Sequence, residues 1–202
     1  MKLTIIGASG HGKVVADIAC NNGYDEIEFL DDDETRTSCG RFSVVGKSEK
    51  AFIADGNVFV AIGNSTVRMQ LLDALLEAGH RVPVLIHPDA VVADDVRLGL
   101  GTVVMAGTVI NPGAEIGKGV IVNTCASVDH DCTVEDYAHI AVGAHLAGTV
   151  HVGQRAWIGI GASVSNNVSI TADAVIGAGA VVVKDIAEKG TYVGVPARRV
   201  KP

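Results

Sequence analysis

The sequence predicts a small Rossmann-like α/β domain over residues 1–84, followed by a parallel β-helix over residues 85–202. In the first part, short apolar runs alternate with segments of helical periodicity, which is typical of a parallel sheet covered by helices. In the second part, an aliphatic residue recurs at every sixth position, which is typical of a repeat architecture. A total of 24 glycines, with only 4% aromatic residues, favours many tight turns over a helical bundle.

The N-terminal part is expected to contain four strands and two helices. The helix at Met69–Ala78 is amphipathic and is followed by Gly79, a common helix terminator. The other helix, Val14–Cys20, ends near Asn22. The predicted strands are Leu3–Ile6, Ile27–Leu30, Val58–Ile62 and Val82–Ile86.

The second part has a strict six-residue period. Every sixth residue from Ile86 to Val182 is Ile, Leu or Val, without an insertion, and the residue four positions further on is mostly small. Three hexads would close one coil, so that residues eighteen apart stack at the strand spacing of about 4.8 Å. An ordinary β-sandwich is a poorer interpretation, because sandwiches vary their loop lengths.

Composition excludes several classes of protein. The net charge of −7 argues against nucleic-acid binding, and no apolar run approaches the roughly 20 residues of a membrane span. The N-terminal segment is too short and too rich in glycine for a signal peptide. The cysteines show no CxxC pair or metal-ligand spacing, so reduced thiols in a cytoplasmic protein are expected. They are Cys20, Cys39, Cys125 and Cys132.

A first candidate site is the glycine-rich segment Gly7–Gly12, between a predicted strand and a predicted helix. Its G-x-x-G-x-G spacing differs from the dinucleotide fingerprint G-x-G-x-x-G, which disfavours NAD. Glycines still let the backbone approach a ligand, and a helix N-terminus attracts phosphate. Asp31, at the end of the next strand, offers an acceptor for a ribose or base. A tight turn with a solvated acidic loop explains the same residues equally well.

A second candidate site is Asp129-His130-Asp131. A histidine of near-neutral pKa suits the removal of a proton from an attacking group, and a flanking carboxylate can fix its tautomer. His130 is the fourth residue of its hexad and faces away from the axis, and its stacked neighbour Gly148 leaves room over the ring. A lone surface histidine is the alternative. The pattern leaves open which carboxylate contacts the imidazole.

Three further histidines, His139, His145 and His151, raise the alternative of a zinc site. They are six residues apart, so they fall on three faces of the helix and cannot converge within one chain. Only a trimer would bring such faces together, so no metal is predicted, and His145 and His151 are interpreted as surface residues. Trp157 is assigned a packing role.

The motifs resemble those of a known enzyme family. The hexads and the ending Val193–Arg199 resemble the hexapeptide-repeat acyltransferases. Both halves together resemble the bacterial UDP-4-amino-sugar N-acetyltransferases and their relatives, the sialic acid O-acetyltransferases. The motifs behind this likeness are Gly7–Gly12, Phe29–Asp32, Ile62–Asn64, Asn123-Thr124 and Asp129–Asp131.

The resemblance implies a left-handed β-helix, a homotrimer, acetyl-CoA as co-substrate bound between adjacent helices, and no metal. His130 would accept the proton, with Asp129 and Asp131 beside it. The basic tail of Arg198, Arg199 and Lys201 would meet the CoA 3′-phosphate or stay solvated. By the same likeness, a UDP- or GDP-linked sugar would contact Ser9, Gly10, His11, Asp31, Asp32, Gly63, Asn64 and Asn123, and acetyl-CoA would contact His139, Gly148, Ile160 and Ala178.

These expectations together predict acetyl transfer to the amine of a UDP-4-amino-4,6-dideoxy sugar for glycan biosynthesis. The alternative within the family is O-acetylation of a sialic acid. The alternative from another class is a non-catalytic, nucleotide-binding trimeric scaffold.

Overall fold

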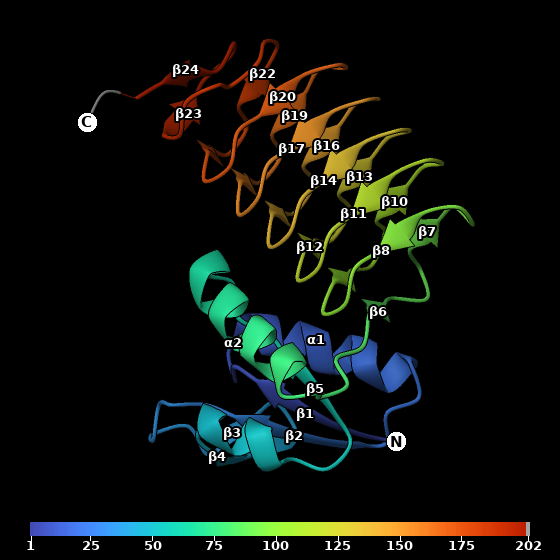
Figure 1. The fold of residues 1–202 in the computed structure, drawn as a ribbon, viewed down its shortest axis with the longest axis vertical. Coiled ribbons are helices and arrows are strands. Elements are labelled where there is room, and N and C mark those ends of the chain that lie inside the picture. Colours follow the sequence, from blue (N-terminus) through green and yellow to red (C-terminus); the bar gives the residue numbers. More distant parts are fainter. Residues whose placement is uncertain (201–202) are drawn as a thin grey trace. The chain divides into compact units, whose positions relative to one another are not determined.

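The computed structural model describes residues 1–200 of the chain. It divides into two compact units, one from Met1 to Pro88 and one that begins at Asp89. Figure 1 shows the first as a sheet with helices and the second as a stack of short strands. Within residues 1–200, neither α-helix is long and apolar enough to cross a membrane.

The first unit is built on a five-stranded sheet in the order β3-β4-β2-β1-β5. β1 lies between β2 and β5 and is parallel to both, and β2 is parallel to β4. Only β3 runs antiparallel to its neighbour, β4. The strands are β1 (Lys2–Ile6), β2 (Glu26–Leu30), β3 (Ser38–Cys39), β4 (Phe42–Gly46) and β5 (Asn57–Val60).

Two α-helices and one 3-10 helix complete this unit: α1 (Gly10–Asn21), η1 (Ser48–Ile53) and α2 (Ser65–Glu77). Gly12 allows α1 to approach the end of β1, since a Cβ there would lie 2.1 Å from the Gly7 carbonyl oxygen and 3.0 Å from the Phe29 ring. Glycine at position 12 therefore serves helix–strand packing. α2 begins where the Asn64 side chain accepts a hydrogen bond from the Val67 N–H at 3.0 Å, a normal N-cap.

Three details of this unit differ from the sequence prediction. The predicted strand Val82–Ile86 shrinks to β6 (Leu85–Ile86), because Pro83 has no N–H for a sheet ladder. Both helices begin four residues earlier than predicted, since polar residues open their first turns. The β3–β4 hairpin and η1 were not predicted, because Ser, Cys and Arg around Gly40 obscure the apolar alternation of an edge hairpin.

The second unit is a parallel β-helix of two-residue strands arranged in three sheets. Up to β22, each sheet takes every third strand, so one coil contributes one strand to each sheet; the antiparallel pair β23–β24 then extends the third sheet. The first sheet contains β7 (Val91–Val92), β10 (Val109–Ile110), β13 (Ser127–Val128), β16 (His145–Leu146), β19 (Ser163–Val164) and β22 (Val181–Val182). The second contains β8 (Arg97–Leu98), β11 (Glu115–Ile116), β14 (Thr133–Val134), β17 (His151–Val152) and β20 (Ser169–Ile170). The third includes β9 (Val103–Val104), β12 (Ile121–Val122), β15 (His139–Ile140), β18 (Trp157–Ile158), β21 (Val175–Ile176), β23 (Thr191–Val193) and β24 (Arg198–Arg199).

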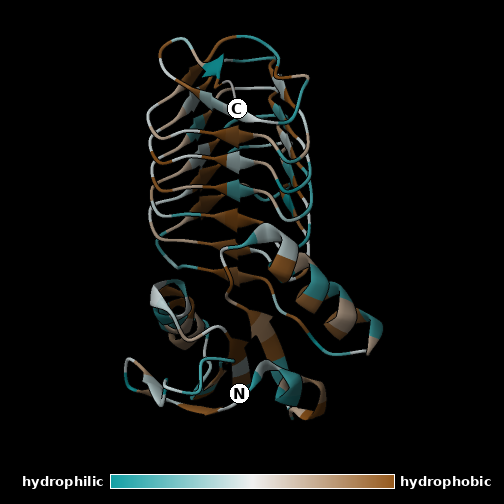
Figure 2. Cartoon of the chain, turned by 90° about the vertical axis from the view of Figure 1, so that its left-hand side faces the viewer, coloured by the Kyte–Doolittle hydropathy of each residue, from teal (hydrophilic) through white to brown (hydrophobic). Residues whose placement is uncertain are grey.

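The predicted stacking of residues eighteen apart is confirmed by the strand register, as in the pairs Ile110↔Val128 and Val134↔Val152. The periodic aliphatic residues from Val104 to Val182 are buried along the axis. Figure 2 shows hydrophobic and hydrophilic strands stacked along these coils. The period ends near the last coil, where Ile176 pairs with Tyr192, only sixteen residues on.

One corner position recurs in every coil with a left-handed backbone. It is the fifth residue of the hexad, four positions after the strand begins. Glycine is the usual residue in this conformation, although Asn and Asp tolerate it better than most. Non-glycine residues occupy it at Cys125, Asp131, Tyr137, Thr149, Arg155, Asn167 and Asp173.

Candidate active site

His130 and Asp131 form a hydrogen-bonded pair at the corner that follows β13. The Nδ1 atom of His130 lies 2.9 Å from Oδ2 of Asp131. Asp131 has a φ of 55°, and the strand alternation of side chains no longer applies at such a corner. Because a carboxylate only accepts hydrogen bonds, Nδ1 carries the proton and Nε2 keeps the free electron pair. The imidazole is therefore set up to accept a proton at Nε2.

Asp129 supports the backbone of His130 rather than its ring. Its Oδ1 accepts a hydrogen bond from the His130 N–H at 2.8 Å and another from Nδ2 of Asn111 at 2.6 Å. The two carboxylates thus have separate tasks, which the sequence left open. Asp131 orients the imidazole, and Asp129 holds the peptide that carries it.

The carboxylates around His130 make it a stronger base. The hydrogen bond to Asp131 and then the charge of Asp129 raise the pKa of His130 above its usual 6.5. In turn, the hydrogen bond from Asn111 and that from the His130 N–H lower the pKa of Asp129, which keeps it ionised. A histidine in this state is a suitable general base near neutral pH.

Two glycines, one coil above and one coil below, make room for the pair. A Cβ at Gly148 would lie 2.4 Å from Nε2 of His130 and 2.5 Å from Cε1. A Cβ at Gly113 would lie 2.5 Å from Oδ1 of Asp131. The sequence pattern identified Gly148 but missed Gly113, although the same count of eighteen residues leads from Asp131 to it.

Asn123 and His139 meet on another sheet. The Asn123 Nδ2 atom lies 3.1 Å from Nε2 of His139, and the His139 ring lies against Trp157 with a centroid distance of 4.1 Å. His139 is buried, with 7% of its surface exposed. These residues belong to the sheet of β12, β15 and β18, whereas His130 follows a strand of the first sheet. Trp157 therefore packs directly on a candidate acetyl-CoA residue.

The other candidate acetyl-CoA residues lie at two corners. Ile160 and Ala178 are exposed and stack eighteen residues apart, with the Gly179 N–H bonded to the Ile160 carbonyl at 2.8 Å. Gly148 lies at a different corner, the one that follows β16. Of the basic tail, Arg199 pairs with Glu188 at 2.6 Å, and Lys201 lies outside the described residues.

His139, His145 and His151 lie on three different sheets. His145 Nδ1 lies 2.8 Å from the Ser127 hydroxyl, and His151 Nε2 lies 3.1 Å from a carboxylate oxygen of Glu135. Among residues 1–200, no three His, Cys, Asp or Glu side chains are grouped in a way that could hold a metal ion.

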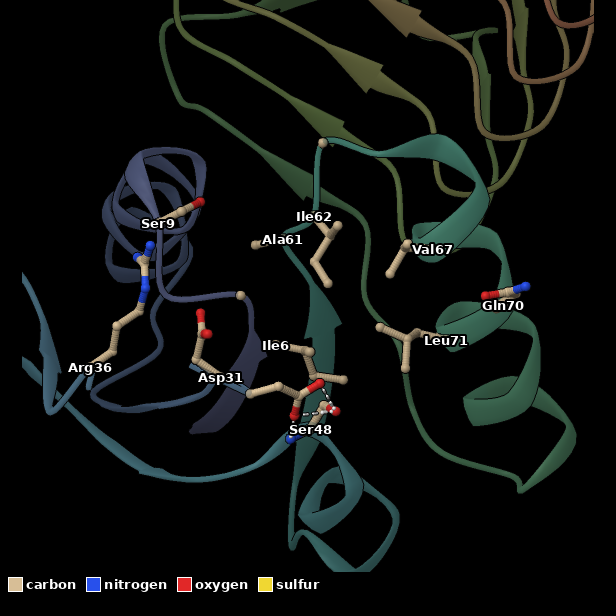
Figure 3. Close-up of a pocket in the computed structure, with 13 residues that line it drawn as sticks. Ile6, Ser9, Asp31, Arg36, Ser48, Ala61, Ile62, Val67, Gln70 and Leu71 are labelled. Atoms are coloured by element: carbon tan, nitrogen blue, oxygen red, sulfur yellow. Dashed lines mark hydrogen bonds between the residues drawn. The ribbon is translucent and has the colours of Figure 1, made fainter. Parts of the chain in front are cut away.

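The first unit contains a cavity of about 410 Å³ at the carboxyl ends of β1, β2 and β5. This is the edge where ligands bind in open α/β sheets. Figure 3 shows Ser9 and Arg36 on one side of it and Val67, Gln70 and Leu71 on the other. The lining residues are Ile6, Gly7, Ser9, Asp31, Asp32, Arg36, Ser48, Ala61, Ile62, Gly63, Val67, Gln70 and Leu71.

Four of the predicted substrate residues line this cavity: Ser9, Asp31, Asp32 and Gly63. The Asp31 oxygens accept hydrogen bonds from the N–H groups of residues 8 and 33, at 2.7 and 2.9 Å. Asp32 accepts from the Ser48 N–H, and this bond is the largest cause of its lowered pKa. The acidic residues thus shape the loop and also line the wall of the cavity.

Three predicted residues, Gly10, His11 and Asn64, do not line the cavity. Burial and, next, the charge of Arg68 lower the pKa of His11 to about 4, so it is neutral at physiological pH. Arg68 is buried and donates to the carbonyls of Ile62 and Gly63 at 2.8 Å each. Asn64 instead caps α2, and His11 lies within reach of the Arg68 charge.

Sequence reasoning missed the one cation among the lining residues, Arg36. Its guanidinium donates from Nη1 to the Ala8 carbonyl at 2.6 Å and from Nε to Asp33 at 3.1 Å. Its position in the loop after a sheet strand was the available signal, because such loops form the ligand edge.

Comparison with known proteins gives matches over both units. Residues 2–75 match the family model described as the PglD N-terminal domain. A UDP-N-acetylbacillosamine N-acetyltransferase of Bacillus subtilis (strain 168) is 36% identical over 110 residues, which are 52% of this chain and 51% of that protein. The chain thus spans about half the length of that relative. A GDP-perosamine N-acetyltransferase of Escherichia coli O157:H7 is 31% identical over 161 residues, which are 75% of this chain and 72% of that protein.

Two solved structures match along nearly the whole chain. The acetyltransferase domain of PglB from Neisseria gonorrhoeae FA1090, in complex with acetyl coenzyme A, is 42% identical with a TM-score of 0.95 and covers 98% of both chains. PerB from Caulobacter crescentus, in complex with CoA and GDP-perosamine, is 38% identical with a TM-score of 0.95, over 100% of this chain and 98% of that one. This likeness confirms the predicted fold class, a small α/β domain followed by a left-handed β-helix.

Proposed function

Since this chain belongs to the family of bacterial nucleotide-amino-sugar N-acetyltransferases, we propose that it acetylates the amine of a nucleotide-linked amino sugar with acetyl-CoA. The acceptor is of the UDP-4-amino-4,6-dideoxy type, and the product serves glycan biosynthesis. The observation that carries this proposal is the pair His130–Asp131, whose free Nε2 faces the space left by Gly148.

His130 acts as the general base in this reaction. Its Nε2 takes the proton of the sugar amine as the amine nitrogen attacks the thioester carbonyl and the C–N bond forms. Asp131 stabilises the resulting imidazolium. When the C–S bond breaks, His130 gives the proton to the departing CoA thiolate, so it ends the cycle neutral. General-base assistance of this kind is typically worth ~10²–10⁴-fold in rate.

The cavity of the first unit holds the nucleotide. Its volume of about 410 Å³ suits a nucleotide, and Arg36 supplies a cation for the diphosphate. The N-terminus of α1 also faces a phosphate in this proposal. Its N-cap residue, Ser9, makes no capping hydrogen bond with its side chain, so that hydroxyl can bond the ligand. On the second unit, His139, Ile160, Ala178 and Gly148 contact acetyl-CoA, and Asn123 contacts the substrate.

The chain acts as a homotrimer. His130 and the Asn123–His139 pair lie on different sheets of one β-helix, so a groove between two copies would let one ligand reach both. A reducing, cytoplasmic location fits the free thiols of all the cysteines. Sedimentation equilibrium tests the assembly: a mass of three chains is expected, and a monomer at micromolar concentration would contradict it.

An acceptor panel tests the reaction. CoA release is measured with acetyl-CoA and UDP- or GDP-linked 4-amino sugars, with free and CMP-linked sialic acid as competing acceptors. We expect release with an amino-sugar nucleotide, and comparison of the two bases identifies the nucleotide. Release only with a sialic acid would replace N-acetylation by O-acetylation, which the named relatives do not favour. Binding of nucleotide without acetyl transfer to any acceptor would favour the scaffold.

A further inference from the structure

Asn111 lies one coil below the His130 corner, directly after β10. It is eighteen residues before Asp129, so the two side chains stack in the ladder of the first sheet. The Asn111 amide donates from Nδ2 to Oδ1 of Asp129 at 2.6 Å, a short distance for an N–H···O hydrogen bond. This contact joins the side chains of two successive coils.

The same carboxylate oxygen also accepts the His130 N–H at 2.8 Å. Asn111, Asp129 and the peptide of His130 therefore form one continuous chain of hydrogen bonds. A second residue of this hexad, Gly113, leaves the space into which the Asp131 carboxylate fits. The coil that contains Asn111 thus supports the catalytic pair at two points.

The charges around this network give Asn111 an electrostatic effect as well. Its hydrogen bond is the largest cause of the lowered pKa of Asp129, and the charge of Asp129 helps to raise the pKa of His130. The other titratable groups near the network are Asp131, Cys132 and His145. Asp131 bonds the ring, the pKa of the Cys132 thiol is raised by burial and then by the charge of Asp129, and His145 lines one groove with Asn111 and Asp129. Asp95, one coil lower, is bonded to the Gly113 N–H at 3.0 Å.

We propose that Asn111 is a positioning residue for acetyl transfer: it fixes Asp129, and through Asp129 it fixes the backbone and the electrostatic environment of the His130 imidazole. This inference rests on the proposed function, in which His130 is the general base. The Asn111 side chain bonds Asp129 and not the imidazole, so its effect on catalysis is indirect.

Two substitutions test the proposal. Asn111→Leu keeps the approximate size but removes the hydrogen bond, and Asn111→Asp adds a carboxylate beside Asp129. The pKa of His130 is measured by NMR titration of histidine-labelled protein without substrate, and His130→Ala assigns the signal. Steady-state kcat and KM are measured on the same proteins. The control is Arg97→Leu, which removes another stacked hydrogen bond, Arg97 to Glu115 at 2.7 Å, on the second sheet.

Opposite shifts of the His130 pKa are expected. In Asn111→Leu, the Asp129 carboxylate loses the bond that holds it near the imidazole, so the pKa of His130 should fall by about half a unit. In Asn111→Asp, the added negative charge should raise the pKa of His130 by about half a unit. Both substitutions should reduce kcat by roughly tenfold, because the imidazole is misplaced. KM should stay nearly unchanged, because substrate binding is unaffected. Arg97→Leu leaves the pKa and kcat unchanged.

An unchanged His130 pKa in both variants, or an unchanged kcat, would overturn the proposal. If Asn111→Leu does not fold, Asn111→Asp decides alone. The NMR titration needs no substrate, so it judges Asn111 even if the wild-type protein acetylates no amino sugar. That last result would refute the proposed function by itself.

Discussion

Replacing Gly148 by alanine tests whether the space over His130 is required for catalysis. The new Cβ would lie 2.4 Å from Nε2, whereas ordinary contacts begin near 3.4 Å, so the imidazole must move by about 1 Å. A misplacement of that size can cost ~10²-fold in rate. Because the His130 ring is exposed, it can swing into solvent without disturbing the core. We therefore expect kcat/KM to fall by ~10²-fold while the melting temperature changes by less than about 3 °C.

The assay measures CoA release at saturating acetyl-CoA, together with thermal unfolding of the same samples. Gly143→Ala is the matched control: a Cβ there would meet nothing within 4 Å, but the backbone φ of 61° strains any side chain. This control should lose more stability than Gly148→Ala and keep its activity. Full activity of Gly148→Ala would refute the reasoning, because the imidazole would then work from a displaced position.

Three further predictions follow from the contacts. Asp131→Asn removes the main cause of the raised pKa of His130, so the acid limb of the kcat/KM–pH profile should move to lower pH. The maximum of kcat/KM should also fall by ~10–10²-fold. An acid limb that does not move would contradict the role of Asp131. Gly12→Ala places a Cβ 2.1 Å from the Gly7 carbonyl oxygen. The free energy of unfolding, measured with urea, should therefore fall by about 1–3 kcal/mol. An unchanged free energy of unfolding would contradict the packing role of Gly12. Arg36→Ala should weaken nucleotide binding by ~10–10²-fold in calorimetry without affecting acetyl-CoA binding, and equal nucleotide affinity would remove Arg36 from the site.

The β-helix and its stacking were readable from the sequence because every coil repeats one local rule. An aliphatic residue every six positions fixes the inward face, and eighteen residues close a coil, so Gly148 could be placed over His130 in advance. The six-residue spacing also predicted that His139, His145 and His151 lie on three different sheets, as the structure shows.

The division of labour between the two carboxylates could not be read in this way. It depends on the left-handed backbone at Asp131, where the alternation of side chains along a strand ends. Asp129 bonds a backbone N–H, and hydropathy carries no signal for such a contact. In the first unit, the edge hairpin and Arg36 were missed because the residues around Gly40 and the loop after β2 show no clear hydrophobic periodicity.

The central claim is that His130 accepts the proton of the attacking amine. It is tested most directly by single-turnover acetyl transfer with wild type and His130→Ala, both saturated with acetyl-CoA and the best acceptor of the panel. The mechanism predicts that the variant still binds both substrates but transfers acetyl at least ~10²-fold more slowly. Transfer at the wild-type rate by His130→Ala would contradict the mechanism.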